Sequence, residues 1–286
     1  DFGGDMQVAL GDGFACVIST QESTANFFNV GNPRNPQLID TLNLTPPPLG
    51  SAAWSGDYVY IPRGSSVKLG VFKINSEGTG MDGVPLDTSS FPSFSGPTDA
   101  EVTGSWLIVR EKNTNRHFFF DISDPAVPAF ISQSNPISAD TTGLDARGDF
   151  VYVSTGGGPS GNGFLEIAEI QSGPFPSVDF LHIIGLPLFG TIDVAASGDY
   201  VYIAGVDVTG EGIFILDATI RTNPTLVATF RDTSLTGIKA LVANSNQLIA
   251  GTNTELVMMD TSTPLSVSVV KAYAAQGLRD VALSDA

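Results

Sequence analysis

The heptapeptide SGDYVYI occurs twice in this chain, at residues 55–61 and again at residues 197–203. Each copy joins a Gly-Asp turn to alternating aromatic and β-branched side chains, a pattern typical of a β-strand. A catalytic loop has little reason to occur twice, whereas a structural unit that is used many times does. The heptapeptide therefore indicates an internal repeat, and the period of that repeat decides the fold.

Weaker copies of this strand occur along the whole chain. They begin at Phe14, Tyr58, Trp106, Phe150, Tyr200 and Gln247, at intervals of 44, 48, 44, 50 and 47 residues. This period is typical of a four-stranded propeller blade or of a pair of helices. Each unit contains four short strand-like segments, and no stretch keeps a helical period between helix caps. The sequence therefore predicts an all-β fold, a single β-propeller domain over residues 1–286 with four-stranded antiparallel blades.

The repeat units favour six blades over seven. Complete units are expected at about residues 6–44, 48–91, 96–138, 141–186, 190–235 and 236–275. The tail, residues 276–286, begins a further unit and leaves three arrangements open. It would supply the innermost strand of the first blade and displace residues 1–10, it would start a seventh blade that continues beyond this sequence, or it would pair with a neighbouring subunit.

The repeat units resemble a known family. The segment DVAASGDYVYIAGV at residues 193–206, the segment GIFILDATIRTNPTLVATF at residues 212–230 and the turn DISDPAVP at residues 121–128 are similar to LVIVD repeats. This resemblance implies a β-propeller, of a family whose members are often secreted or attached to the cell surface. The repeat itself implies no particular activity.

Composition limits the partners. A formal net charge of -17 would repel nucleic acid and anionic lipid surfaces, and the longest apolar runs are too short to cross a bilayer. The single cysteine, Cys16, lies in a strand-like segment and has no intramolecular disulfide partner. Because the chain begins at Asp1, we expect a processed product or an excerpt. These features favour an extracellular or cell-surface protein, with a cytoplasmic protein as the alternative.

Four aspartates recur near the start of the innermost strand of their units: Asp99, Asp145, Asp193 and Asp280. In a propeller this position borders the central channel, so their carboxylates would bind Ca²⁺, another divalent cation or an amine. No cofactor is implied beyond such a cation. The alternative is that each aspartate accepts backbone N–H groups in its own turn.

Five of the thirteen basic residues fall in or beside the loops between the second and third strands of units two and three: Arg63, Lys68, Arg110, Lys112 and Arg116. Such a rim would bind an acidic protein partner or an anionic glycan. The alternative is a chance grouping of solvated charges.

Catalytic signals are weak elsewhere. His117 and His182 belong to no metal-binding spacing, and no nucleophile elbow is present. The loop at residues 205–212 contains two carboxylates but does not match an EF-hand. The leading hypothesis is therefore a non-enzymatic extracellular or cell-surface module for interaction or self-assembly, including terminal strand exchange between subunits. The alternatives are a metal-dependent enzyme or ligand binder at the channel mouth, and an anionic-glycan-binding propeller.

Overall fold

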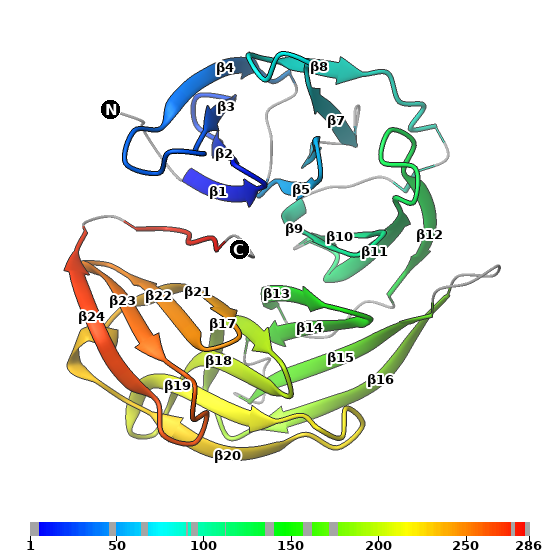
Figure 1. The fold of residues 1–286 in the computed structure, drawn as a ribbon. Helices are drawn as coiled ribbons and strands as arrows, with labels where there is room; N and C mark the ends of the chain where they lie inside the picture. The colour runs from blue at the N-terminus through cyan, green and yellow to red at the C-terminus, as the bar shows by residue number, and fades with distance from the viewer. Residues whose placement is uncertain are drawn as a thin grey trace. The chain divides into compact units, whose positions relative to one another are not determined.

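The computed structural model describes residues 6–45, 50–63, 68–89, 91–92, 97–111, 113–134, 140–156, 162–171, 177–275 and 278–283. Over these ranges the protein consists of β-strands and a single 3₁₀ turn, Thr233–Leu235. The strands form six antiparallel sheets of four strands each (Figure 1). The predicted fold, a β-propeller of six four-stranded blades, is confirmed.

The chain divides into two compact units, and the first comprises residues 1–136. It contains three blades. Their strands are β1 (Met6–Gly11), β2 (Phe14–Ser19), β3 (Thr24–Asn29) and β4 (Gln37–Asn43), then β5 (Ala53–Ser55), β6 (Tyr58–Pro62), β7 (Leu69–Ile74) and β8 (Met81–Val84), then β9 (Pro97–Thr103), β10 (Trp106–Glu111), β11 (Arg116–Asp121) and β12 (Ala129–Gln133).

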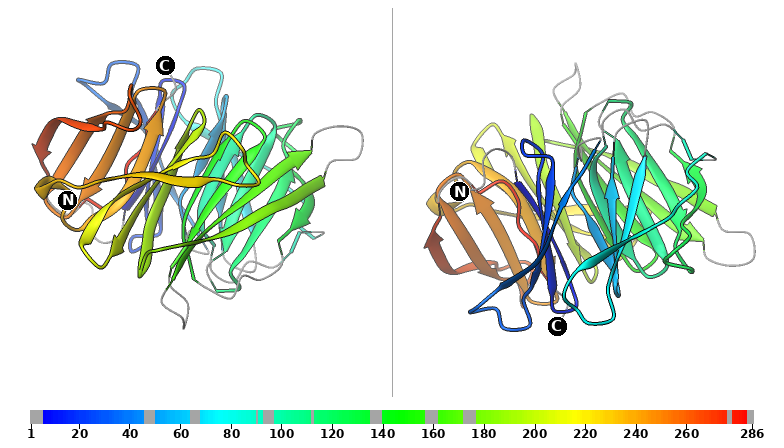
Figure 2. Two further views of the ribbon diagram at one scale, coloured as in Figure 1. Left: turned by 90° about the horizontal axis from the view of Figure 1, so that it is seen from below. Right: turned by 90° about the horizontal axis from the view of Figure 1, so that it is seen from above.

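The second unit, residues 137–285, contains the other three blades. Their strands are β13 (Thr141–Arg147), β14 (Phe150–Thr155), β15 (Gly163–Gln171) and β16 (Ser177–Leu186), then β17 (Gly190–Ser197), β18 (Tyr200–Asp207), β19 (Gly210–Asp217) and β20 (Thr225–Phe230), then β21 (Ile238–Asn244), β22 (Gln247–Thr252), β23 (Glu255–Asp260) and β24 (Ser268–Ala274). Within each blade, consecutive strands lie side by side and alternate in direction (Figure 2).

The heptapeptide SGDYVYI forms the first turn and the second strand of its blade. Gly56 and Gly198 have φ angles of 54° and 57°, a left-handed conformation that favours glycine and reverses the chain within two residues. In the strand that follows Gly198, Val201 and Ile203 pack in one interblade core, whereas Tyr202 packs in the core on the opposite face of the blade. The repeat therefore encodes a strand that is buried on both faces, as stacked blades require.

The second tyrosine of the heptapeptide also contacts the next blade. Tyr60 is fully buried, and its hydroxyl group donates a hydrogen bond to the backbone oxygen of Pro125 at 3.0 Å. Pro125 belongs to the turn DISDPAVP, so the two most characteristic parts of the repeat meet across the junction of two blades in the first unit.

The two termini differ from the expected arrangement in which the tail replaces residues 1–10 in the first blade. Residues 6–11 form β1, the innermost strand of the first blade, and pair with β2, so the expected displacement of residues 1–10 is wrong for the part that the structure describes. In the tail, residues 278–283 form no strand. Leu278 and Val281 instead lie against Gly251 in β22, where an added Cβ atom would come within 3.0 Å of Val281 Cγ1.

Candidate functional site

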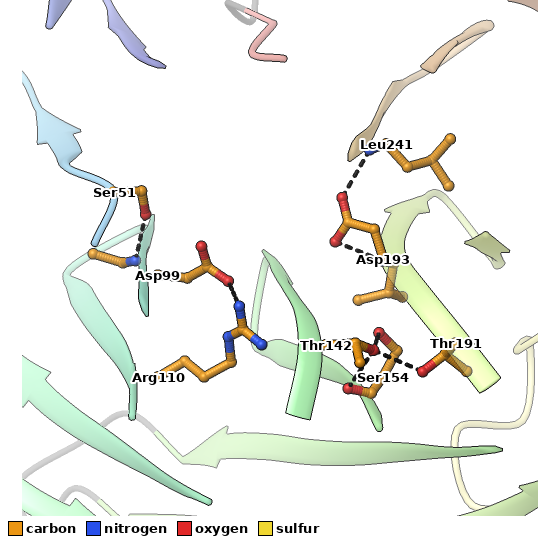
Figure 3. A network of polar contacts seen from close by, with 10 residues as sticks. Ser51, Asp99, Arg110, Thr142, Ser154, Thr191, Asp193 and Leu241 are labelled. Atoms are coloured by element: carbon orange, nitrogen blue, oxygen red, sulfur yellow. Dashed lines mark hydrogen bonds and ion pairs between the residues drawn. The ribbon is translucent and has the colours of Figure 1, made fainter. Parts of the chain in front are cut away.

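Asp145 and Asp193, two of the three candidate carboxylates in the second unit, have the same hydrogen-bonding pattern. Asp193, in β17, accepts a hydrogen bond from its neighbour Val194 N at 2.9 Å on Oδ1 and from Leu241 N at 2.7 Å on Oδ2 (Figure 3). Leu241 belongs to β21, the innermost strand of the following blade. The Asp193 side chain therefore connects the innermost strands of two adjacent blades.

Asp145, in β13, repeats this arrangement one blade earlier. Its Oδ1 accepts from Ala146 N at 2.8 Å, and its Oδ2 accepts from Ala196 N of β17 at 2.6 Å. Arg147 Nε lies 3.4 Å from Oδ1. Burial raises the pKa of Asp145, while the charge of Arg147 and the two backbone N–H groups act in the opposite direction. The backbone contacts predicted as the alternative to cation binding are thus present, and half of them reach the neighbouring blade.

Asp280, in the tail, shares the first half of the pattern. Its Oδ1 accepts a hydrogen bond from Val281 N at 2.8 Å. The side chain is half-buried, and the residues around it lie against β22. Asp145, Asp193 and Asp280 therefore each accept a hydrogen bond from the N–H group of the following residue.

In the first unit, Asp99 has a different partner. It forms an ion pair with Arg110, which faces it in the adjacent strand β10 and is only 7% exposed (Figure 3). Burial raises the pKa of Asp99, and Arg110 opposes that shift. One residue from each predicted set, the carboxylates and the basic rim, is therefore brought together within a single blade.

The same cross-strand row continues to a buried imidazole. His117 in β11 faces Arg110 in the register, is 1% exposed, and its Nε2 atom has no hydrogen-bond partner. Burial, together with the nearby charge of Arg110, lowers the pKa of His117 to about 3. This imidazole is neutral at physiological pH. His117 is therefore a packed side chain of this blade.

The remaining basic candidates make internal contacts or lie outside the described residues. Arg63 is buried, and Lys68 Nζ donates to Thr88 O at 2.9 Å and to Phe91 O. Arg116 is half-buried, and Lys112 lies outside the described residues. The positive charges of Lys68 and Arg110 therefore interact with groups of this chain.

Sequence reasoning did not identify two further polar features of the second unit. The hydroxyl groups of Thr142, Ser154 and Thr191 are clustered, with Oγ1 of Thr142 at 3.0 Å from Ser154 Oγ and 2.6 Å from Thr191 Oγ1 (Figure 3). Glu166 is 5% exposed, its Oε2 has no hydrogen-bond partner, and burial raises its pKa to about 7. A glutamate within the apolar run LEIA was the signal for the second feature.

Within the described ranges, no group of three or more His, Cys, Asp or Glu side chains is arranged to hold a metal ion. In the loop at residues 205–212, Asp207 pairs with Arg231 at 2.6 Å and Glu211 accepts from Gly237 N at 2.6 Å. The loop carboxylates are therefore bound to protein donors. No helix in the part of the chain that the structure describes is long and apolar enough to cross a membrane.

Comparison with known proteins supports the repeat and the fold. The sequence model of the LVIVD repeat matches residues 190–232, which confirms the resemblance for the blade that begins with β17. No curated protein matches the chain.

Solved structures of several kinds share the fold. A Lactobacillus plantarum protein is 10% identical with a TM-score of 0.72, covering 96% of this chain and 86% of its own. The periplasmic gluconolactonase PpgL of Pseudomonas aeruginosa is 13% identical with a TM-score of 0.67, covering 95% of this chain and 85% of its own. The hydrazine synthase of Kuenenia stuttgartiensis is 12% identical with a TM-score of 0.67, covering 93% of this chain and 79% of its own. Because proteins with such different names share the architecture, the likeness establishes the fold alone.

Proposed function

We propose that this β-propeller, which contains an LVIVD repeat at residues 190–232, is a non-enzymatic module for protein interaction or assembly at the cell surface or outside the cell. The observation that carries the proposal is the hydrogen bonding of the Asp145 and Asp193 carboxylates. Both oxygens of each carboxylate accept backbone N–H groups, and one of the two N–H groups belongs to the next blade. The recurring residues best suited to chemistry thus hold the scaffold together.

The acidic composition supports the proposed location. A net charge of -17 keeps a protein soluble and favours basic partners over nucleic acid or anionic membranes. The family resemblance implies secreted and cell-surface proteins in the same way. Fractionation of the native host would test this, since recovery in the cytoplasm would contradict the location while leaving the scaffold role intact.

The scaffold role is tested by measuring the metal content and the stability of the purified protein. Under this proposal, purified protein contains less than about 0.1 equivalent of divalent metal, and substitution of Asp193 by alanine changes stability without changing metal content. Stoichiometric metal that is lost in Asp193→Ala would instead assign these carboxylates to a cation.

A second candidate function is a ligand-binding or metal-dependent enzyme at the channel mouth, using Asp99, Asp145, Asp193 and Asp280. The similarity in fold to a periplasmic gluconolactonase and the partial exposure of Asp99 beside Arg110 favour it. Incubation with glucono-δ-lactone, followed by pH-stat titration, tests this candidate. Hydrolysis above the uncatalysed rate that falls at least about tenfold in Asp99→Asn would support it over the scaffold role.

A third candidate is binding of an anionic glycan by the basic residues Lys112 and Arg116, together with Arg63, Lys68 and Arg110. Its support is their grouping in two consecutive units, whereas the internal contacts of Lys68 and Arg110 weigh against it. This function would be favoured if the wild type is retained on heparin and Arg116→Glu is not. Lowering the salt concentration should then restore retention of the variant.

A further inference from the structure

Among the described residues, the outer strand of each blade has one hydrogen-bonded neighbour within its sheet, which leaves its second edge available to another chain. We propose that the outer strand β20 (Thr225–Phe230) is the edge through which two copies of this chain pair in an antiparallel arrangement. The proposal rests on the assembly role proposed above, and it names both the surface and the partner.

Charge distinguishes β20 from most other outer strands. Two copies that each carry a net charge of -17 repel one another, so a contact between them must avoid carboxylates. The sequence of β20, TLVATF, contains no charged residue and is rich in β-branched and aromatic side chains. Leu226 and Val227 are 40% and 41% exposed, which leaves apolar surface on this strand.

A two-fold axis through the middle of β20 gives a register without like charges. Val227 would face Ala228 of the second copy, and Leu226 would face Thr229. At the ends, Arg231 would face Pro224, and Asp232 would face Asn223. The Arg231 guanidinium is already paired with Asp207 in its own chain. In every facing pair, therefore, at most one of the two residues is charged.

Four of the other outer strands contain a charged residue. Two of these are Asp40 in β4 and Lys271 in β24. β8 and β16 contain Asp82 and Asp179, respectively. β12 has no charge, but its apolar side chains Phe130 and Ile131 are half-buried.

A β-bulge limits how tight this pairing is. Where β19 pairs with β20, the register shifts between Ile215 and Leu216, so Val227 is an additional residue of β20. Where β23 pairs with β24, the shift between Met258 and Met259 makes Val270 the additional residue of β24. Bulges weaken the hydrogen-bonding ladder that an edge offers. We therefore expect a weak, concentration-dependent dimer that strengthens when salt screens the net charge.

Sedimentation velocity of the full chain at increasing protein concentration, in about 0.02 M and about 0.5 M NaCl, measures this dimer. Val227→Glu should raise the dissociation constant at least about tenfold, because it places two carboxylates beside the two-fold axis. Val270→Glu is the matched control, since Val270 is 65% exposed and occupies the corresponding bulge of β24. Mixing Val227→Glu with Val227→Lys should restore a heterodimer.

Each outcome separates the two proposals. A monomer at all concentrations and both salt concentrations overturns self-pairing, and so does an equal loss of association in Val270→Glu. Association that is insensitive to Val227→Glu assigns assembly to another surface and leaves the proposed function in place. The lactone hydrolysis and metal measurements described above address the proposed function independently of any dimer.

Discussion

Asp193 Oδ2 accepts a hydrogen bond from Leu241 N at 2.7 Å, and this contact joins the innermost strands of two consecutive blades. Asp145 makes the equivalent contact with Ala196 N. A blade cannot bury both of its faces alone, so a propeller needs interactions that fix each blade against the next. The recurring aspartate supplies one such interaction near the start of the innermost strand, in addition to the apolar packing between blades.

Removing one of these connections should destabilise the fold without affecting any surface. Asp145→Ala leaves Ala196 N and Ala146 N without this acceptor and removes one partner of Arg147. We expect a loss of about 3 kcal/mol in the free energy of unfolding, measured by urea denaturation. Asp149→Ala, at an exposed turn two residues beyond Arg147, is the control and should change stability by less than about 0.5 kcal/mol. Equal effects of the two substitutions would contradict the structural role of Asp145.

Glu166 should make stability depend on pH. Burial raises the pKa of its carboxyl from an ordinary 4.5 to about 7, so the folded protein binds this proton more tightly than the unfolded chain does. Its stabilising contribution is complete below pH 4.5 and is lost as the pH rises through about 7. Between these limits the wild type should lose about 3 kcal/mol relative to Glu166→Gln, which cannot ionise.

The matched control for Glu166 is Glu169→Gln, at a half-buried position of the same strand β15. Unfolding free energies measured at intervals between pH 4.5 and pH 8 compare the three proteins. The account predicts that Glu169→Gln keeps the pH dependence of the wild type. Parallel curves for wild type and Glu166→Gln would show that Glu166 ionises normally in the folded protein.

Deleting residues 276–286 tests the role of the tail. Leu278 and Val281 lie against Gly251, so the deletion exposes apolar surface on β22 and should cost about 2 kcal/mol of stability. Circular dichroism during thermal unfolding measures the effect. Unchanged stability combined with loss of self-association would instead support donation of the tail to a neighbouring subunit.

The hydroxyl group of Tyr60 should contribute to the junction between two blades of the first unit. Tyr60→Phe removes the hydrogen bond to Pro125 O and leaves that oxygen without this donor, with an expected loss of about 1 kcal/mol. Tyr58→Phe, at the half-buried first tyrosine of the same heptapeptide, is the control for removing a hydroxyl group. Chemical denaturation of both variants gives the comparison, and a larger loss in Tyr58→Phe would contradict the assigned role.

The sequence was sufficient to predict the blades because their determinants are local. The positive φ of Gly198 and the alternation from Tyr200 to Ile203 are set within a few residues, and each recurs with the period of the blade. The alternative role for the aspartates, capping of their own segment, follows from the same local geometry. This role could be predicted from the sequence for Asp193, whose Oδ1 accepts a hydrogen bond from the adjacent Val194 N.

Contacts between distant residues were not predictable in this way. The partner of Asp193 Oδ2 lies 48 residues ahead, and the pairing of Asp99 with Arg110 depends on the strand register. That register turns Arg110 inward, where a count of basic residues had suggested a charged rim. The tail, likewise, begins with the sequence of a repeat, yet residues 278–283 form no strand and β1 keeps the innermost position in the first blade.

The most direct test of the account is the free energy of unfolding of wild type and Asp193→Ala, each measured in EDTA and in about 1 mM CaCl₂. If Asp193 serves to connect blades, the substitution lowers stability by about 2 kcal/mol and Ca²⁺ changes neither protein. Stabilisation of the wild type by Ca²⁺ that disappears in Asp193→Ala would contradict the account, because it would make this carboxylate a cation ligand.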